Sequence, residues 1–182
     1  MRKLFASLAL CASVFAFGVC ASGQEGPKLK LGDPIPSVAV KDQDNASVNL
    51  AEEGKSGYTL VFFYPRALTR GCTAQACSLR DAYEELQAKG VKVFGASTDG
   101  PEKQKEFITV NSLPYKLLAD TDKKVIEAFG VPLMNLGSDS AASRQAYLFK
   151  DGKLVWFDTK ASTAKQAEDV LNAIAKLAEV GK

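Results

Sequence analysis

The sequence predicts an α/β protein in which a mixed sheet has helices on both sides. Along the middle of the chain, apolar segments with the length of buried strands alternate with segments whose apolar residues recur at helical spacing. Near the C-terminal end, two more apolar segments flank a short polar turn, and an amphipathic helix pattern follows. Alternating strands and helices favour parallel pairing, whereas the hairpin adds an antiparallel pair, so the predicted sheet is mixed.

Three strands and a long helix are predicted in the first half of the chain. Residues 38–40 and 48–50 flank a polar turn, which is typical of a hairpin. Residues 58–64 are almost continuously apolar, as expected of a central strand that is covered on both faces. Residues 72–89 are predicted to form a helix that ends at Gly90. Its apolar residues at helical spacing are Leu79, Ala82, Tyr83 and Leu86.

The second half continues the alternation and closes with a hairpin and a helix. The predicted strands are 91–96, 116–119, 145–149 and 154–157, and the predicted helices include 101–110 and 122–129. The turn Lys150-Asp151-Gly152-Lys153 is a strong hairpin signal. Ser162 or Thr163 is predicted to cap the last helix. Its inward residues are Val170, Leu171, Ile174 and Leu177. Residues 131–143 are predicted to be the one long loop.

The N-terminal residues have the pattern of a cleaved export signal. Arg2 and Lys3 give a positive start, residues 4–19 are apolar, and small residues follow at a cleavage site near Ala21. We therefore expect a signal peptide at 1–21, a linker at 22–29 and one domain at 30–182. This predicts a periplasmic or secreted protein without stable membrane association after cleavage. A retained anchor is the less favoured alternative, and the bulky Val19 disfavours lipidation of Cys20.

Charge and composition exclude several kinds of partner and site. The formal net charge is +2, and removal of residues 1–21 takes away Arg2 and Lys3 but no acid, which leaves 2 − 2 = 0. No clustered basic patch remains, so nucleic acid is not an expected partner. The chain contains no histidine, which excludes histidine-based catalytic triads, Cys–His pairs and imidazole sites for zinc or copper. We expect neither a cofactor nor a bound metal.

Cys72 is the residue that points most directly to chemistry. It lies just after the strand 58–64 and in the first turn of the predicted helix. Free N–H groups and the helix dipole favour an anion there, so a thiolate would be stabilised. A single cysteine is more often a small buried apolar residue. Here Pro65, Thr69 and a second cysteine at position 77 favour a reactive thiolate instead.

The spacing Pro65-x-x-x-Thr69-x-x-Cys72 resembles the active-site signature of peroxiredoxins. The run from Gly71-Cys72-Thr73 to Ala76-Cys77, followed by Arg80-Asp81, is similar to the bacterioferritin comigratory protein or peroxiredoxin Q subgroup. Two later runs are similar to that subgroup as well. The first is Gly95-Ala96-Ser97-Thr98-Asp99, with Phe107 following it. The second is Leu113-Pro114-Tyr115-Lys116-Leu117-Leu118-Ala119-Asp120. The likeness extends over roughly residues 30–178. It implies a thioredoxin-like fold and a thiol-dependent peroxidase.

The resemblance also implies roles for individual residues. Cys72 would be the peroxidatic nucleophile, Thr69 would hydrogen-bond its sulfur or the peroxide, and Pro65 would shield the sulfenate. Arg144 stands where the family has a distant arginine that enters beside the cysteine, and its charge would hold the developing negative oxygen. Cys77 would be the resolving residue that forms an intramolecular disulfide.

Helix geometry sets a condition on that disulfide. Five residues of an α-helix rise about 7.5 Å and turn about 140° beyond a full turn. A disulfide needs Cα atoms within about 7 Å and converging Cβ vectors. Cys72 and Cys77 are therefore expected to join only if the first turns of the helix unwind in each catalytic cycle.

The chain departs from the subgroup near the predicted site. An acidic residue and a proline are common in the turn where this chain has Ala67-Leu68 and Arg70. Gln75 stands where glutamate is usual, and Gln104 stands where histidine is common. These departures leave the peroxidase chemistry intact but affect the hydrogen-bond network and substrate preference. Arg66 and Arg70 are interpreted first as solvated charges and second as groups that steer the substrate.

The expected partners are a hydroperoxide substrate and a thioredoxin-like reductant, whose identity the sequence does not specify. A resolving cysteine in the same chain removes the chemical need for a dimer, so a monomer is expected. Two alternatives remain on the same fold: a thiol–disulfide oxidoreductase, and a redox-regulated chaperone or binding module. The oxidoreductase normally carries Cys-x-x-Cys, whereas this chain has Cys-x-x-x-x-Cys. Direct peroxide turnover would separate the peroxidase from both alternatives.

Overall fold

The computed structural model describes residues 28–137 and 139–180. The predicted signal peptide at 1–21 and residues 22–27 of the predicted linker lie outside the described residues. Leu29, the second described residue, is already packed in the hydrophobic core. None of the helices within residues 28–137 and 139–180 combines the length and the apolar character that a membrane span requires.

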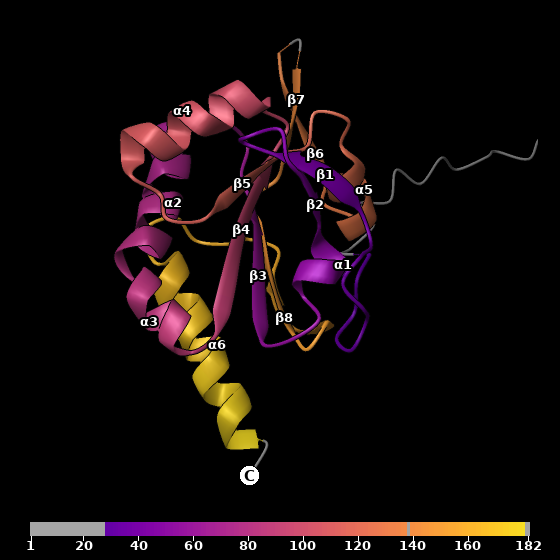
Figure 1. Ribbon diagram of the computed structural model, residues 1–182, viewed down its shortest axis with the longest axis vertical. Coiled ribbons are helices and arrows are strands. Elements are labelled where there is room, and N and C mark those ends of the chain that lie inside the picture. The colour runs from indigo at the N-terminus through magenta and orange to yellow at the C-terminus, as the bar shows by residue number, and fades with distance from the viewer. Residues whose placement is uncertain (1–27, 138, 181–182) are drawn as a thin grey trace, which may run out of the picture.

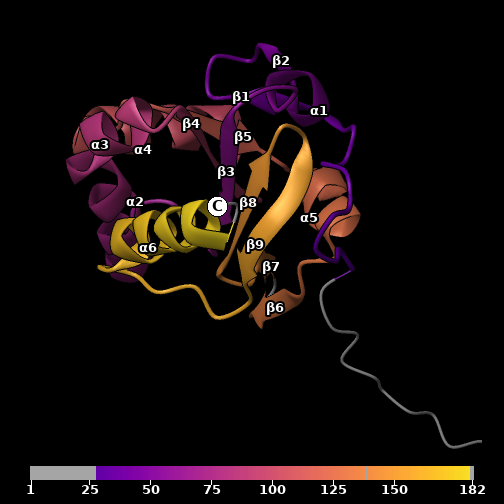
Figure 2. The same cartoon turned by 90° about the horizontal axis from the view of Figure 1, so that it is seen from below.

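A seven-stranded sheet forms the centre of the domain, with strand order β2-β1-β5-β4-β3-β8-β9 (Figure 1; β9 is labelled in Figure 2). Strands β3, β4 and β5 are parallel, and β1, β8 and β9 add antiparallel pairs. The predicted mixed sheet is therefore confirmed. The strands are β1 (Ala39–Asp42), β2 (Ser47–Asn49), β3 (Tyr58–Phe63), β4 (Val91–Ser97), β5 (Lys116–Ala119), β8 (Gln145–Lys150) and β9 (Lys153–Asp158).

Helices cover both faces of this sheet, as predicted (Figure 2). One face carries α2 (Arg70–Asp81), α3 (Tyr83–Ala88), α4 (Pro101–Asn111) and α6 (Gln166–Val180). The other carries α1 (Leu50–Glu53) and α5 (Lys124–Phe129). Strand β3 supplies both cores, because Leu60 and Phe62 face the first layer of helices while Val61 and Phe63 face the second. This two-sided burial explains why the segment is apolar throughout.

Close packing at the centre of the sheet requires a glycine in β4. A Cβ atom on Gly95 would lie 2.6 Å from Leu117 Cδ2 and 2.7 Å from Phe62 Cζ. Both neighbours are completely buried, so neither can move aside without disturbing the core. The glycine thus allows β3 and β5 to pack their large side chains over β4.

The predicted helix 72–89 is wrong in its extent and continuity. The structure has two helices, and the first begins at Arg70, two residues earlier than predicted. The break is at Ala82, whose backbone departs from the helical region with φ −101° and ψ 14°. A one-residue break leaves the spacing of the apolar residues almost unchanged, so periodicity does not reveal it.

The predicted long loop at 131–143 is also wrong. It contains an antiparallel hairpin of β6 (Leu133–Leu136) and β7 (Asp139–Ala142), with Gly137 at φ +72° in the turn. All four residues of β6 are exposed, so the segment lacks the alternation of apolar and polar residues that marks a half-buried strand.

The start of the last helix differs from the prediction as well. Helix α6 begins at Gln166, so neither Ser162 nor Thr163 is its capping residue. The Ser162 hydroxyl donates a hydrogen bond to the carboxylate of Asp169 in the first turn. The predicted inward face is correct, because Val170 and Ile174 are buried in the core and Leu171 and Leu177 pack, partly buried, against the same core.

Candidate active site

The first turn of α2 follows the loop after β3 and places Cys72 in the hydrophobic core. Thr69 is the N-cap residue and has extended backbone angles, so Cys72 is the third residue of the helix. Only 2% of Cys72 is exposed, and its side chain belongs to the core cluster that contains Tyr64 and Ala67. The amides of a first helical turn have no partners within the helix, and they favour a negative charge on this sulfur.

Sheet register brings Arg144 to the same place. Phe63 at the end of β3 pairs with Gln145 at the start of the antiparallel strand β8. The residue before β8 therefore lies beside the loop that follows β3. Arg144 Nη2 donates a hydrogen bond to Cys72 Sγ at 3.4 Å. A Cβ atom on Gly71 would lie 3.3 Å from the same nitrogen, so a glycine at this position leaves room for the guanidinium.

Two buried glutamines extend the hydrogen bonds of Arg144 away from the sulfur. Arg144 Nη1 donates to the side-chain oxygen of Gln75, and Gln75 Nε2 donates to Gln166 Oε1 at 2.8 Å. Both glutamines are completely buried. Sequence reasoning did not assign Gln166 to the site, and nothing in the local pattern at the start of α6 marks it.

The loop from Tyr64 to Thr69 is held in a defined conformation. Asp99 Oδ2 accepts a hydrogen bond from the Ala67 amide at 2.8 Å and another from the Ser97 hydroxyl at 2.7 Å. Leu68 has φ +62°, a left-handed conformation that non-glycine residues adopt at an energetic cost. Asp99 therefore positions the loop that carries Pro65, which is itself partly buried.

The Thr69 hydroxyl, which is expected to hydrogen-bond the sulfur or the peroxide, donates to a backbone carbonyl in the structure. The acceptor is the carbonyl oxygen of Arg66 at 2.9 Å, and the Thr69 side chain is exposed. A hydroxyl oxygen that donates its proton still has lone pairs that accept hydrogen bonds. The Thr69 hydroxyl oxygen can therefore still accept a hydrogen bond while it donates to Arg66.

Behind the loop lies a buried hydrogen-bond network. Tyr64 donates to the side-chain oxygen of Gln104, and Gln104 Nε2 donates to Ser97 Oγ at 2.9 Å and to the Leu118 carbonyl at 3.0 Å. Burial raises the pKa of Tyr64 far above its usual value, so its hydroxyl stays protonated and remains a donor. The network ties the start of the loop to α4 and β5.

Cys77 lies further along α2 and faces a different neighbour. Its thiol is half-buried and is 3.9 Å from Asn111 Oδ1 at the end of α4. The Tyr115 hydroxyl donates to the Ala76 carbonyl at 2.8 Å and so supports the same stretch of helix. Both Cys72 and Cys77 are free thiols on an intact helix. The geometric condition derived from the sequence therefore applies, since a disulfide between them requires α2 to unwind.

The two arginines next to the loop do not share the position of Arg144. Arg66 forms an ion pair of 3.0 Å with Asp139 on β7, and both side chains are substantially exposed. Arg70 is exposed at the start of α2. Among the hydrogen bonds of residues 28–137 and 139–180, Arg144 is the donor that reaches the Cys72 sulfur.

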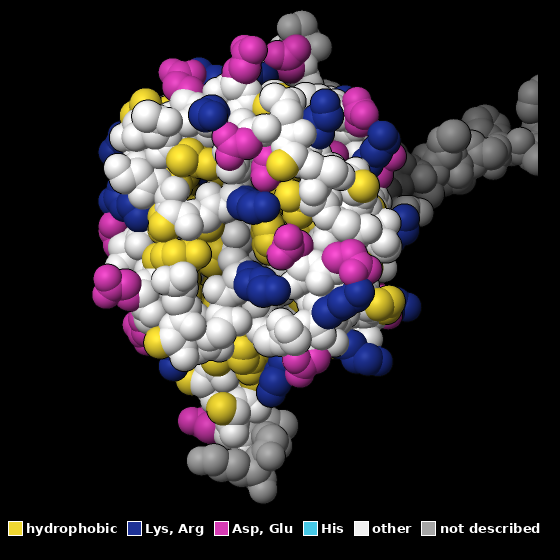
Figure 3. Space-filling view, viewed as in Figure 1, with side chains coloured by type: hydrophobic (Ala, Val, Ile, Leu, Met, Phe, Trp, Pro, Cys, Tyr) yellow, Lys and Arg dark blue, Asp and Glu magenta, His cyan; other side chains and the backbone are white. Residues whose placement is uncertain are grey.

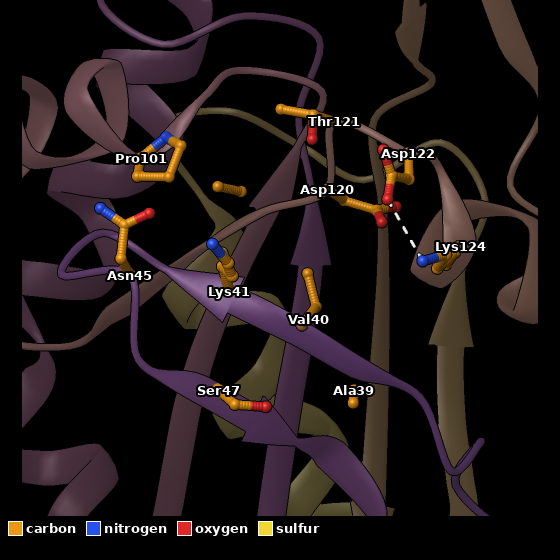
Figure 4. A pocket seen from close by; sticks show the side chains of 11 residues that line it. Ala39, Val40, Lys41, Asn45, Ser47, Pro101, Asp120, Thr121, Asp122 and Lys124 are labelled. Carbon is orange, nitrogen blue, oxygen red and sulfur yellow. Dashed lines mark ion pairs between the residues drawn. The ribbon is translucent and has the colours of Figure 1, made fainter.

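Charged side chains of the described residues also line a groove away from Cys72. On the face in Figure 3, basic and acidic side chains are interspersed. A groove beside the β1–β2 hairpin has Lys41 and Asn45 on one side and Asp120 and Asp122 on the other, with Asp122 paired to Lys124 at 3.2 Å (Figure 4). Neither Cys72 nor Arg144 lines it. Among the described residues, no group of three or more histidine, cysteine or acidic side chains is placed to hold a metal ion.

Comparison with known sequences places these features in a family. The family model described as AhpC/TSA family matches residues 31–157. Peroxiredoxin Bcp of Escherichia coli strain K12 is 49% identical over 104 residues, which cover 57% of this chain and 65% of that protein. The chloroplastic peroxiredoxin Q of Gentiana triflora is 40% identical over 122 residues, or 66% of this chain and 54% of that protein. The matched part of the chain thus spans less than two thirds of the length of these relatives.

Solved structures agree with the fold. Peroxidoxin BcpB from Mycobacterium tuberculosis is 29% identical, superposes with a TM-score of 0.74, and the match covers 81% of this chain and 97% of that one. A cysteine-to-serine mutant of Xanthomonas campestris peroxiredoxin Q is 21% identical, with a TM-score of 0.72 and coverage of 82% and 98%. The second likeness concerns the fold alone. The expected thioredoxin-like fold is confirmed.

Proposed function

The chain belongs to the AhpC/TSA family, and from this premise we propose that it is a thiol-dependent peroxidase for hydrogen peroxide and organic hydroperoxides. The observation that carries the proposal is the contact between Arg144 Nη2 and Cys72 Sγ at 3.4 Å in the first turn of α2. A cationic donor and the helix N-terminus both favour the thiolate, which is the form of cysteine that attacks a peroxide.

The proposed first step is attack of the Cys72 thiolate on one oxygen of the hydroperoxide. The S–O bond forms as the O–O bond breaks, and the leaving oxygen departs as an alcohol or water after it takes up a proton. Cys72 is oxidised to sulfenic acid, and the hydroperoxide is reduced. Arg144 stabilises the negative charge that develops on the leaving oxygen, while Thr69 accepts a hydrogen bond from the hydroperoxide.

The proposed second step resolves the sulfenic acid. The Cys77 thiol attacks Cys72, water leaves, and an intramolecular disulfide remains. A thioredoxin-like protein is the proposed reductant, because a disulfide is reduced by exchange with a dithiol. Turnover with thioredoxin and its reductase tests this step separately from the reaction with peroxide.

Direct consumption of peroxide distinguishes the proposal from the alternatives. Reduced protein is mixed with hydrogen peroxide or cumene hydroperoxide, and the loss of peroxide and of free thiol is followed. The peroxidase should oxidise Cys72 with a stoichiometry of one peroxide per chain. A thiol–disulfide oxidoreductase or a redox-regulated chaperone should leave the peroxide largely unreacted. Such a result would overturn the proposal.

We also propose that the protein is exported and acts as a monomer. The charged start and apolar run of residues 2–19 support export, and the presence of both reactive cysteines in one chain supports a monomer. Cell fractionation and N-terminal sequencing of the mature protein test export. Light scattering of the reduced protein tests the oligomeric state, and a stable dimer would contradict it.

A further inference from the structure

The glutamine pair behind Arg144 has an orientation that can be deduced from its partners. A guanidinium only donates hydrogen bonds, so the Gln75 side chain must turn its oxygen toward Arg144. The Gln75 amide nitrogen therefore faces Gln166, which must present its own oxygen. The nitrogen of Gln166 is then left buried without a hydrogen-bond partner among the described residues.

An orphaned donor in a completely buried side chain calls for an explanation, because most buried polar groups are paired. A leucine at position 166 would fill similar space without an unpaired polar group. The side-chain oxygen is the group that a leucine would lack, and it acts on Gln75 and, through Gln75, on Arg144. We call the hydrogen bonds from Arg144 to Gln75 and from Gln75 to Gln166 the glutamine relay. Both glutamines are neutral, so the relay fixes the guanidinium without offsetting its positive charge.

We propose that Gln166 is a positioning residue for Cys72, because it holds Gln75 so that Arg144 is aimed at the sulfur while α2 is folded. The inference rests on the proposed function and adds a residue of the C-terminal helix to its site. Gln75 lies between Cys72 and Cys77, so unwinding of α2 must pull Gln75 away from both Arg144 and Gln166. The relay therefore stabilises the folded, peroxide-reactive helix against the unwound helix that forms the disulfide.

The test uses the full chain in its reduced form with the variant Gln166→Leu. The thiolate of Cys72 is followed by its ultraviolet absorbance as a function of pH, and hydrogen exchange of residues 73–79 is followed by mass spectrometry. Loss of the Gln166 oxygen as an acceptor should reduce the thiolate population at a pH where wild-type Cys72 is only partly ionised, and it should accelerate exchange. Each effect should be at most roughly fivefold, the factor that corresponds to one lost hydrogen bond of about 1 kcal/mol. Gln166→Met, which has a similar linear shape, replaces the leucine variant if that variant does not fold.

Ser78→Ala is the matched control. The Ser78 hydroxyl accepts a hydrogen bond from the Ala167 amide at 3.1 Å, so this variant also removes a bond between α2 and α6 but leaves the relay untouched. Ser78→Ala should accelerate hydrogen exchange of residues 73–79 without changing the pH dependence of the Cys72 thiolate absorbance, which is called the thiolate profile below. A double variant tests whether Gln166 acts through Gln75. When Gln75 is already alanine, Gln166→Leu should have little further effect on the pH dependence of the Cys72 thiolate absorbance.

Two results would overturn the inference: a thiolate profile in Gln166→Leu equal to that of wild type, or an undiminished effect of Gln166→Leu when Gln75 is already alanine. Both readouts use reduced protein and need no peroxide. If instead wild-type Cys72 is not oxidised by peroxide, the proposed peroxidase function fails while the relay can still be judged.

Discussion

Replacement of Arg144 by alanine should slow the reaction with peroxide by roughly 10²-fold. The guanidinium nitrogen is 3.4 Å from the Cys72 sulfur. At an effective dielectric constant of about 20 to 40, two unit charges at that separation attract by roughly 2.5–5 kcal/mol. The guanidinium charge is spread over three nitrogens and is partly exposed, so the lower end of that range applies. Since about 1.4 kcal/mol corresponds to a factor of ten in rate, the loss is roughly 10²-fold.

The assay is rapid mixing of reduced protein with hydrogen peroxide, with Cys72 oxidation followed before the disulfide forms. Arg66→Ala and Arg70→Ala are the matched controls, because both remove a positive charge next to the same loop. Arg66 is engaged in an exposed ion pair with Asp139, so its loss should change the rate much less. Equal losses in all three variants would refute the assignment of Arg144.

The remaining predictions concern the cysteines and the groups that hold their helix and loop. Cys72→Ser should abolish peroxide consumption, and sustained turnover in this variant would contradict the mechanism. Cys77→Ser should complete one turnover and then stall as a sulfenic acid or mixed disulfide, which mass spectrometry of the treated protein detects. Tyr115→Phe removes the hydrogen bond to the Ala76 carbonyl, worth about 1 kcal/mol, and should speed disulfide formation several-fold in quenched time courses, whereas a slower reaction would be inconsistent with α2 unwinding. Asp99→Ala leaves the Ala67 amide without its acceptor and should lower the unfolding free energy by about 1–3 kcal/mol in urea titrations, whereas an unchanged midpoint would show that the loop does not depend on this bond.

The sheet and the main helices were predictable because their burial leaves a direct pattern. Strand β3 is apolar on both faces, and Val170 and Ile174 of α6 follow helical spacing. The β6–β7 hairpin left no such pattern, because all of β6 is exposed. The break at Ala82 depends on one residue's backbone angles, which side-chain periodicity does not report.

The site was only partly predictable. Cys72 could be singled out from its place between a buried strand and a helix, but Arg144 lies 72 residues away and was assigned through the family resemblance. Its proximity is produced by the pairing of β3 with β8, which no local pattern encodes. Gln166 lies 91 residues from Gln75, and a glutamine at a helix start has no local feature that predicts its burial.

Mass spectrometry of the reduced protein after addition of one equivalent of peroxide tests the central claim most directly. We expect Cys72 and Cys77 to be recovered in one disulfide-linked peptide pair from a monomeric chain, with hydrogen exchange of residues 73–79 faster than in the reduced protein. Recovery of both cysteines as free thiols would contradict the peroxidase function. A covalent dimer, or exchange that is identical in both redox states, would contradict resolution by unwinding of α2.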